Sequence, residues 1–204
     1  MRKVILDYYF IDEYERLDKD YCFIDFPPKE IHLQSWRLKK GEPMEEIYPE
    51  DIGVTMSNEY PGRVLTDFIA NVELCLIVSK AVKKTMEKVN QGPIEFLPLW
   101  IYNHKSRLES KDYFYVNPLG AYDVLDLNKS GVDYYEDSEK VISVDWYVLS
   151  RKKLNQPNLP DIFRIKEWPK AYVISQRMLE ALQAMNPAPV NLVVEKIEIH
   201  EDVE

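Results

Sequence analysis

The chain has 204 residues, of which 46% are hydrophobic and 30% are charged, and its formal net charge is −9. Its 14 Tyr, 7 Phe and 4 Trp exclude a low-complexity or disordered chain, because burial of such rings offsets the chain entropy that folding removes. An acidic chain repels phosphate backbones, so we expect no nucleic-acid partner and instead a basic protein partner.

Membrane association is not expected either. No apolar run is as long as a membrane span, and the basic start at residues 1–3 is followed by only three apolar residues before Asp7, which is too few for a signal peptide. Cys22 and Cys75 stand in apolar surroundings and are expected to be buried, free thiols. These features predict a cytoplasmic protein.

The first elements along the chain are strands. Residues 3–10 and 21–26 are rich in aromatic and β-branched residues, an acidic stretch separates them, and Pro27 and Pro28 end the second strand. Between residues 29 and 62 basic and acidic pieces alternate and Gly and Pro are frequent. This composition predicts short strands and loops at the surface.

Regular structure returns with the apolar run at residues 72–78, which predicts a buried strand. Ser79 follows it as an N-cap for a helix with Val82, Met86 and Val89 on one stripe. Four lysines lie mostly off this stripe, and we interpret them as a solvated face rather than as a surface that grips an acidic partner or nucleic acid. They are Lys80, Lys83, Lys84 and Lys88.

After Asn90 and Gly92, which are typical helix stops, alternating apolar residues predict a strand from residue 94 to residue 102. Pro98 interrupts the strand and predicts either a bulge or an edge position. Further strands are expected to fill the middle of the chain. They are residues 113–116, 132–135, 141–149 and 162–165.

The pattern of strand, Ser, helix, Asn, Pro and strand recurs near the C-terminus. Ser175, Met178, Leu182 and Met185 repeat the spacing that begins at Ser79, and the offset of 96 (79 to 175) is constant as far as Ile197. This repetition predicts either two similar strand-helix-strand units or two independent uses of common cap chemistry. We expect a single α+β domain over residues 1–204 with mainly antiparallel sheets and few short helices, divisible into pseudo-repeated halves at about 1–105 and 106–204.

The sequence lacks the usual signatures of catalysis and cofactor binding. The six glycines are too far apart for a phosphate-binding loop, and the spacing of His32, His104 and His200 fits no metal site. We therefore expect no cofactor and no metal. The alternative is an enzyme with a site assembled in space, either from a cysteine with a distant histidine or from a carboxylate pair such as Asp123 and Asp126.

Several segments resemble an immunity-protein family of bacterial polymorphic toxin systems, the eleventh in the usual series and formerly a domain of unknown function. Residues 115–126 are similar to the family's Asn-x-Leu-x-x-x-Asp-Ala-Leu-Asp segment, with Val124 in place of Ala. The sequence around Pro187 and Pro189 departs from the family's usual turn. Shorter matching segments lie at residues 25–28, 76–79, 94–98, 162–164 and 173–175.

The resemblance implies a non-enzymatic cytoplasmic protein that binds and blocks a cognate toxin, with no catalytic residues to carry over. Independently, two acidic and aromatic segments offer charge to steer a basic toxin and rings to anchor it. The first candidate comprises Tyr134, Tyr135, Glu136, Asp137 and Glu139. The second lies in the loop of residues 42–51 and comprises Glu45, Glu46 and Tyr48. The alternative interpretation of the first segment is an ordinary solvated hairpin.

Overall fold

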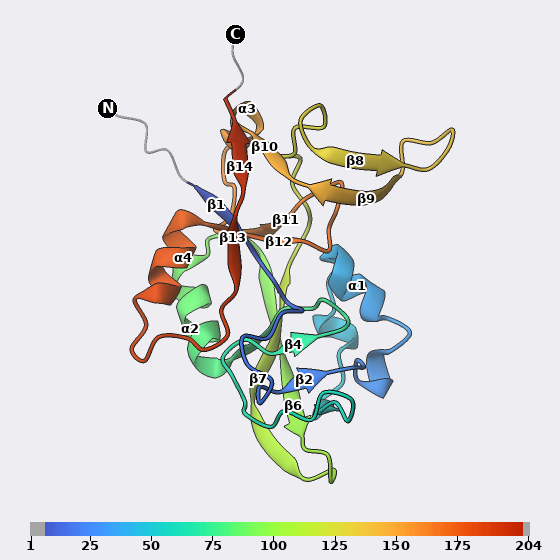
Figure 1. Ribbon diagram of the computed structural model, residues 1–204, viewed down its shortest axis with the longest axis vertical. Helices are drawn as coiled ribbons and strands as arrows, with labels where there is room; N and C mark the ends of the chain where they lie inside the picture. The colour runs from blue at the N-terminus through green and yellow to red at the C-terminus, as the bar shows by residue number, and fades with distance from the viewer. Residues whose placement is uncertain (1–6, 202–204) are drawn as a thin grey trace.

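Two four-stranded sheets form the centre of the computed structural model, which describes residues 7–201 (Figure 1). The first sheet has the order β3 (Gly53–Thr55), β6 (Ile94–Tyr102), β7 (Leu108–Pro118) and β5 (Ile77–Ser79). The second has the order β11 (Ile162–Arg164), β12 (Tyr172–Ser175), β1 (Tyr8–Ile11) and β13 (Val194–Lys196).

Smaller elements surround these sheets. The two-stranded pairs are β2 (Phe23–Ile24) with β4 (Ala70–Asn71), β8 (Gly131–Tyr134) with β9 (Val141–Trp146), and β10 (Val148–Ser150) with β14 (Glu198–His200). The helices are α1 (Ser35–Lys40), α2 (Lys80–Val89), α3 (Arg151–Leu154) and α4 (Gln176–Gln183), with short 3-10 turns η1 (Lys29–Ile31) and η2 (Glu45–Ile47). Apart from β2–β4, β3–β6 and β10–β14, the strand pairs are antiparallel, which confirms the predicted α+β class.

Each four-stranded sheet contains a strand-helix-strand unit with the same connection. In the first sheet α2 joins β5 to β6, and both strands pair antiparallel with β7 between them. In the second sheet α4 joins β12 to β13, and both strands pair antiparallel with β1. The central strands also match in residue type. Tyr113, Phe114, Tyr115 and Val116 of β7 take the register positions that Tyr8, Tyr9, Phe10 and Ile11 take in β1.

The two units differ in where the central strand originates. Strand β7 follows β6 directly, whereas β1 comes from the N-terminal part of the chain and pairs with strands more than 160 residues away. The division into halves at about residue 105 stays a prediction. The predicted offset of 96 is wrong beyond α4, because Val194, and not Leu192, occupies the position that corresponds to Phe96. The connection after α4 is therefore two residues longer than the one after α2.

Both predicted helix caps are present. The Ser79 hydroxyl accepts a hydrogen bond from the Val82 amide, and the Ser175 hydroxyl accepts one from the Met178 amide. The two helices pack against each other along one flank of the molecule (Figure 1). Their stripes form one buried cluster with apolar residues of both sheets, which confirms four of the predicted core positions, while Val89 and Met185 are partly buried and pack against the cluster. Its fully buried helical residues are Val82, Met86, Met178 and Leu182.

The segment from residue 29 to residue 62 differs from the prediction of a surface region. It contains α1, and six of its apolar side chains lie in a buried cluster with β6 and β7. In this segment single apolar residues alternate with charged ones, so the hydropathy pattern does not indicate that it contributes to the core. The buried residues are Ile31, Leu38, Met44, Ile52, Val54 and Met56.

Two further strand predictions need correction or refinement. In the run at residues 72–78, only Ile77 and Val78 belong to a strand, while Val72 is 48% exposed and Leu74 has a φ of 54°. The strand prediction at Pro98 is confirmed, because β3 pairs with β6 only from Trp100 onwards, which leaves that side of Pro98 without a strand partner. A proline without an N–H therefore fits this position.

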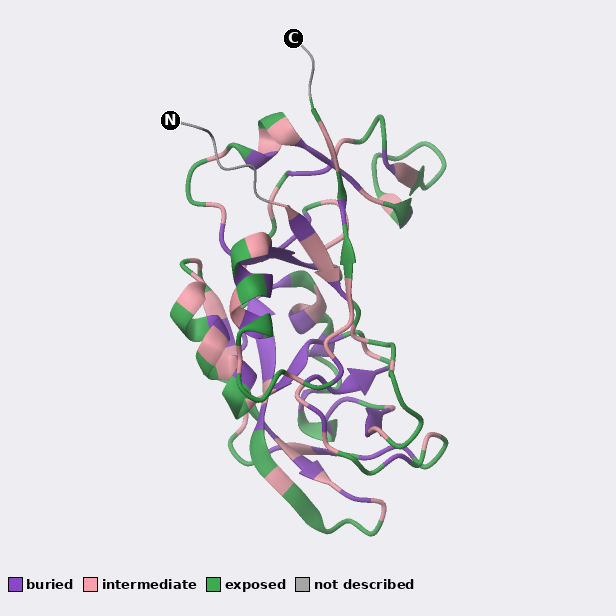
Figure 2. Cartoon of the chain, turned by 60° about the vertical axis from the view of Figure 1, so that its left-hand side comes forward, coloured by how far each residue is buried: buried purple, intermediate pink, exposed green. Residues whose placement is uncertain are grey.

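A buried arginine links the two sheets. The Arg164 side chain on β11 donates to the Pro118 carbonyl at 3.2 Å, to the Leu38 carbonyl and to the Tyr172 hydroxyl at 2.8 Å. Figure 2 shows how the buried residues concentrate where the sheets and helices meet, whereas the outer loops are exposed. Since a buried guanidinium needs its donors satisfied, this set of bonds fixes β7, α1 and β12 relative to one another.

Candidate functional site

The β8–β9 hairpin projects from the body of the molecule (Figure 1). Within residues 7–201 its two strands pair only with each other. Its tip is closed by a hydrogen bond from the Tyr135 amide to the Lys140 carbonyl at 3.0 Å and by one from the Ser138 amide to the Tyr135 carbonyl at 3.1 Å. Asp137 has a φ of 56° in this turn, a conformation that Asp tolerates better than most residues. We call residues 131–146 the acidic hairpin.

Large side chains are unusually exposed on the acidic hairpin. Tyr134 is 43% exposed, Tyr135 is 50% exposed and Trp146 is 58% exposed. The Lys140 ammonium lies 5.3 Å from the centre of the Tyr135 ring, and it is the only lysine or arginine in the hairpin. The hairpin also carries five exposed carboxylates. They are Asp133, Glu136, Asp137, Glu139 and Asp145.

A cavity of about 800 Å³ lies between the acidic hairpin and the segment that follows β11. Tyr134, Glu139 and Val141 line it from the hairpin, and Lys166 and Glu167 line it from the other side. Burial raises the pKa of Glu167. The cavity is therefore a recess beside the exposed ring of Tyr134.

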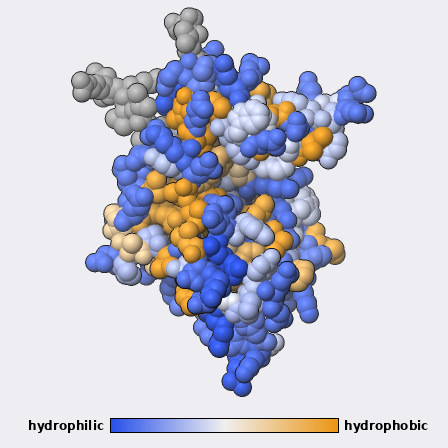
Figure 3. All heavy atoms as spheres, in the orientation of Figure 1, coloured by the Kyte–Doolittle hydropathy of each residue, from blue (hydrophilic) through white to orange (hydrophobic). Residues whose placement is uncertain are grey.

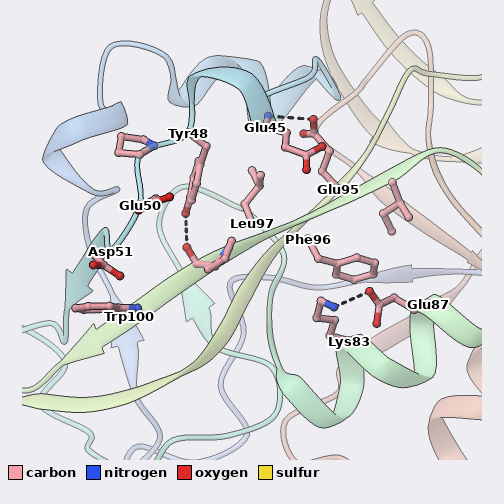
Figure 4. Close-up of a pocket in the computed structure, with 13 residues that line it drawn as sticks. Glu45, Tyr48, Glu50, Asp51, Lys83, Glu87, Glu95, Phe96, Leu97 and Trp100 are labelled. Atoms are coloured by element: carbon pink, nitrogen blue, oxygen red, sulfur yellow. Dashed lines mark hydrogen bonds and ion pairs between the residues drawn. The ribbon is translucent and has the colours of Figure 1, made fainter.

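A second acidic surface is a groove on the outer face of β6 (Figure 4). Phe96 and Trp100 form its floor, and Glu45, Glu50 and Asp51 stand on the side of η2 and β3. Its cavity volume is about 460 Å³. We call this surface the acidic groove. It contains the predicted residues Glu45 and Tyr48, whereas Glu46 is exposed on η2 but does not line it.

Cations already cover part of the acidic groove. Lys83 is paired with Glu87 at 2.5 Å and stands 5.2 Å from the centre of the Phe96 ring, and Lys111 stands 3.6 Å from the centre of the Trp100 ring. The sequence predicted that Lys83 belongs to a solvated face. This prediction is wrong for Lys83, because its ammonium contacts Glu87 and the Phe96 ring. Tyr48 is held by its hydroxyl, which donates to the Pro98 carbonyl at 2.8 Å, so its ring supports the groove wall.

Glu95 at the end of the acidic groove has an architectural role. Its carboxylate accepts hydrogen bonds from the Met44 amide at 3.0 Å, from the Glu45 amide at 3.1 Å and from the Asn117 side chain at 2.9 Å. These donors satisfy a carboxylate that would be costly to bury without partners. Glu95 therefore anchors η2 to β6 and shapes the groove.

The residues considered for catalysis have other partners. Burial raises the pKa of the Cys22 thiol and of the Cys75 thiol to about 12 each, which keeps both protonated and poorly nucleophilic near neutral pH. Asp126 contacts the His200 ring at 2.7 Å and accepts from the Asn128 amide at 3.0 Å, as expected for a cap. Asp123 pairs with Lys153 at 2.7 Å.

Within residues 7–201, no group of three or more His, Cys, Asp or Glu side chains is arranged to hold a metal ion. No helix in this part of the chain has the length and apolar character to cross a membrane.

Sequence reasoning missed several members of both surfaces. Trp146 ends β9 within the strand predicted at residues 141–149, and the hydropathy pattern does not indicate that its side chain is exposed. Phe96 and Trp100 were predicted as strand residues only. Alternate residues of a strand face opposite sides of the sheet, and Leu97 and Leu99 face the core. The alternation therefore indicates that Phe96 and Trp100 lie on the outer face.

A comparison with protein-family models found one match, to the immunity protein family Imm11, over residues 6–197. The match covers nearly the whole chain and confirms the family resemblance that the sequence motifs indicated. The chain belongs to the Imm11 immunity protein family. No match was found among curated proteins.

Proposed function

We propose that this immunity protein neutralises a toxin domain of a bacterial polymorphic toxin system in the cytoplasm. It does so by stoichiometric, non-catalytic binding, and the acidic hairpin is the main contact surface. The observation that carries the proposal is the exposure of Tyr134, Tyr135 and Trp146 among carboxylates on one projecting element. Exposed aromatic side chains of this kind are typical anchors of protein interfaces.

The charge of the hairpin supports a basic toxin as partner. Its carboxylates attract a basic surface over about one Debye length, roughly 10 Å at 0.1 M salt, and so raise the association rate. The rings then contribute apolar burial once the complex forms. The neighbouring cavity, lined by Tyr134 and Lys166, offers a place for one protruding toxin side chain.

The acidic groove is the less favoured contact surface. Its two rings already hold the ammonium groups of Lys83 and Lys111, so a basic toxin would have to displace these lysines. In the acidic hairpin, Lys140 is the one lysine that stands over an exposed ring, that of Tyr135. Inhibition by binding is favoured over the enzymatic alternative for two reasons. The pKa of both cysteine thiols is raised, and the carboxylates of Asp123 and Asp126 have structural partners.

The test is association of the purified protein with the toxin domain that is encoded next to it. The triple variant Glu136→Gln, Asp137→Asn, Glu139→Gln should slow association most at low salt, and the difference should fade as ionic strength rises. Tyr135→Ala or Trp146→Ala should mainly speed dissociation, by about tenfold or more for an anchoring ring.

The matched control neutralises three exposed carboxylates outside both surfaces. This control triple variant, Asp20→Asn, Glu30→Gln, Glu59→Gln, changes the net charge equally. If both triple variants slow association to the same degree, net charge rather than the hairpin steers the toxin. Full protection of cells by a hairpin variant that also associates at the parental rate would overturn the assignment of this surface.

A further inference from the structure

A third cavity lies at the end of β1, apart from the two acidic surfaces. Its volume is about 530 Å³, and it opens between β1, β13 and the segment just before β12. Glu13 lines this cavity. The backbone on both sides of Glu13 is fixed, because the Asp12 amide donates to the Val193 carbonyl at 3.0 Å and the Glu13 carbonyl accepts from the Asn71 amide at 2.8 Å. We call this cavity the Glu13 pocket.

The carboxylate of Glu13 is incompletely satisfied. Its Oε1 atom is shielded from solvent and has no hydrogen-bond partner among the described residues. Burial raises the pKa of Glu13 well above its ordinary value, and this effect exceeds the opposing ones of its own backbone amide and of Arg164. Because a buried charge without a partner is costly, this carboxylate is stabilised by any cation that reaches it. Contact with either oxygen suffices, since the charge is shared between them.

The walls of the Glu13 pocket suit an organic cation. Tyr147 and Trp168 line it, and the Tyr147 ring is held by Phe10 at a centroid distance of 4.3 Å. The Lys170 ammonium already stands 4.9 Å from the centre of the Trp168 ring, a geometry in which an aromatic face attracts a cation. Figure 3 shows apolar side chains gathered on this face of the molecule, near β13.

The charge of the pocket lining is strongly negative. Asp12, Glu15 and Glu195 join Glu13, and Lys170 is the one basic residue among the lining residues. No ion pair between Lys170 and a lining carboxylate is formed within the described part of the chain. The pocket therefore combines an incompletely satisfied carboxylate, an aromatic wall and a negative rim.

We propose that the Glu13 pocket binds one cationic side chain, an arginine or a lysine, of a protein partner. Glu13 is its counter-ion and the ring of Trp168 its aromatic contact. The identity of that partner as the basic toxin rests on the proposed function, whereas the recognition of a cationic side chain does not. Lys170 competes for the same aromatic face.

The test of cation binding uses small probes and the full-length protein. N-acetyl-arginine amide and N-acetyl-lysine amide are titrated at millimolar concentrations while the indole N–H of Trp168 is followed by NMR. We expect a saturable shift for at least one cationic probe and none for N-acetyl-citrulline amide, the neutral analogue of arginine. Glu13→Gln, which keeps the side-chain shape, should weaken binding at least tenfold.

Two matched variants separate the specific site from general charge. Glu15→Gln removes an exposed rim charge and should weaken binding less than threefold. Lys170→Met removes the competing ammonium and should strengthen binding. The proposal is overturned if neither cationic probe gives a saturable shift, if the citrulline probe binds equally well, or if Glu13→Gln binds the probe like the parent.

A second arm tests the assignment to the toxin. Glu13→Gln should raise the dissociation rate of the toxin complex about tenfold, and an unchanged rate would overturn the toxin as occupant. This outcome is distinguishable from failure of the proposed function, because the probe titration requires no toxin and the hairpin variants act on a different surface.

Discussion

The two strand-helix-strand units use one cap design in two environments. In each unit the cap serine donates its hydroxyl to an aspartate and its amide to that aspartate's carbonyl, Asp67 for Ser79 and Asp161 for Ser175. Asp161 is only 4% exposed and also binds Arg177, with a distance of 2.8 Å to its Nε. Asp67 is partly exposed and binds the Val190 amide instead. Local sequence therefore fixes the cap, and burial fixes how much it contributes.

The units also differ at the buried carboxylates beside their central strands. Near the end of β7, Glu95 accepts bonds from Met44, Glu45 and Asn117. Just after β1, Oε1 of Glu13 has no hydrogen-bond partner within residues 7–201. Similar topology therefore does not impose similar polar satisfaction. Glu95 anchors η2 to β6 through its hydrogen bonds, whereas Glu13 is the proposed counter-ion for a cationic side chain.

The largest expected effect tests whether the two helices are equivalent. Met86 in α2 and Leu182 in α4 are both 0% exposed and belong to one cluster. Truncation of either to Ala should lower the free energy of unfolding by about 2–5 kcal/mol, since a cavity adds to the lost apolar burial. Urea denaturation followed by circular dichroism measures this loss. A value below about 1 kcal/mol for one helix only would show that the units contribute unequally.

The next effect concerns the satisfied carboxylate. Glu95→Gln should lower the free energy of unfolding by about 1–3 kcal/mol, because an amide nitrogen would face backbone donors that need an acceptor. Glu87→Gln, in the exposed pair with Lys83, is the matched control and should stay within about 0.5 kcal/mol of the parent. Equal losses in both variants would contradict an architectural role for Glu95.

The caps should respond in proportion to burial. Ser175→Ala should lower the free energy of unfolding by about 2 kcal/mol and Ser79→Ala by about 1 kcal/mol. Each aspartate loses a donor, but Asp161 is buried and cannot replace it with water, whereas Asp67 is partly exposed and can. Denaturation of both variants in parallel measures it. Neither change should alter toxin binding, and a larger loss for Ser79→Ala would reverse the comparison.

The smallest expected effect is a gain in the free energy of unfolding when the unsatisfied carboxylate of Glu13 is replaced. The unfolded chain releases the Glu13 proton near the ordinary carboxyl pKa, whereas burial delays this release in the folded chain. The parent therefore loses stability as pH rises between these two pKa values. Glu13→Gln should gain about 1 kcal/mol near pH 7 and nothing at about pH 3. Thermal unfolding across this range measures the gain, and a variant less stable than the parent at pH 7 would contradict it.

The candidate surfaces were predictable only in part. Charge and aromatic content in sequence marked the acidic hairpin, because its residues are neighbours along one turn. For the acidic groove, the sequence predicted only the residues in the loop of η2. Phe96 and Trp100 come from a strand about 50 residues further along the chain. Tyr48 stays a predicted binding residue, and its hydroxyl donates a hydrogen bond to the Pro98 carbonyl. No local pattern indicates such a long-range bond.

The sequence by itself determined what depends on near neighbours. Ser79 and Ser175 each cap a helix through an amide three residues away, and the stripes of α2 and α4 follow from the helical period. Tertiary structure decided the rest. The pairing of β1 with β12, the bond from Tyr9 to Gln176 at 2.6 Å and the unsatisfied position of Glu13 join or separate groups that lie far apart in the chain. Hydropathy predicts that a residue is buried, but only the packed chain determines which polar atoms meet.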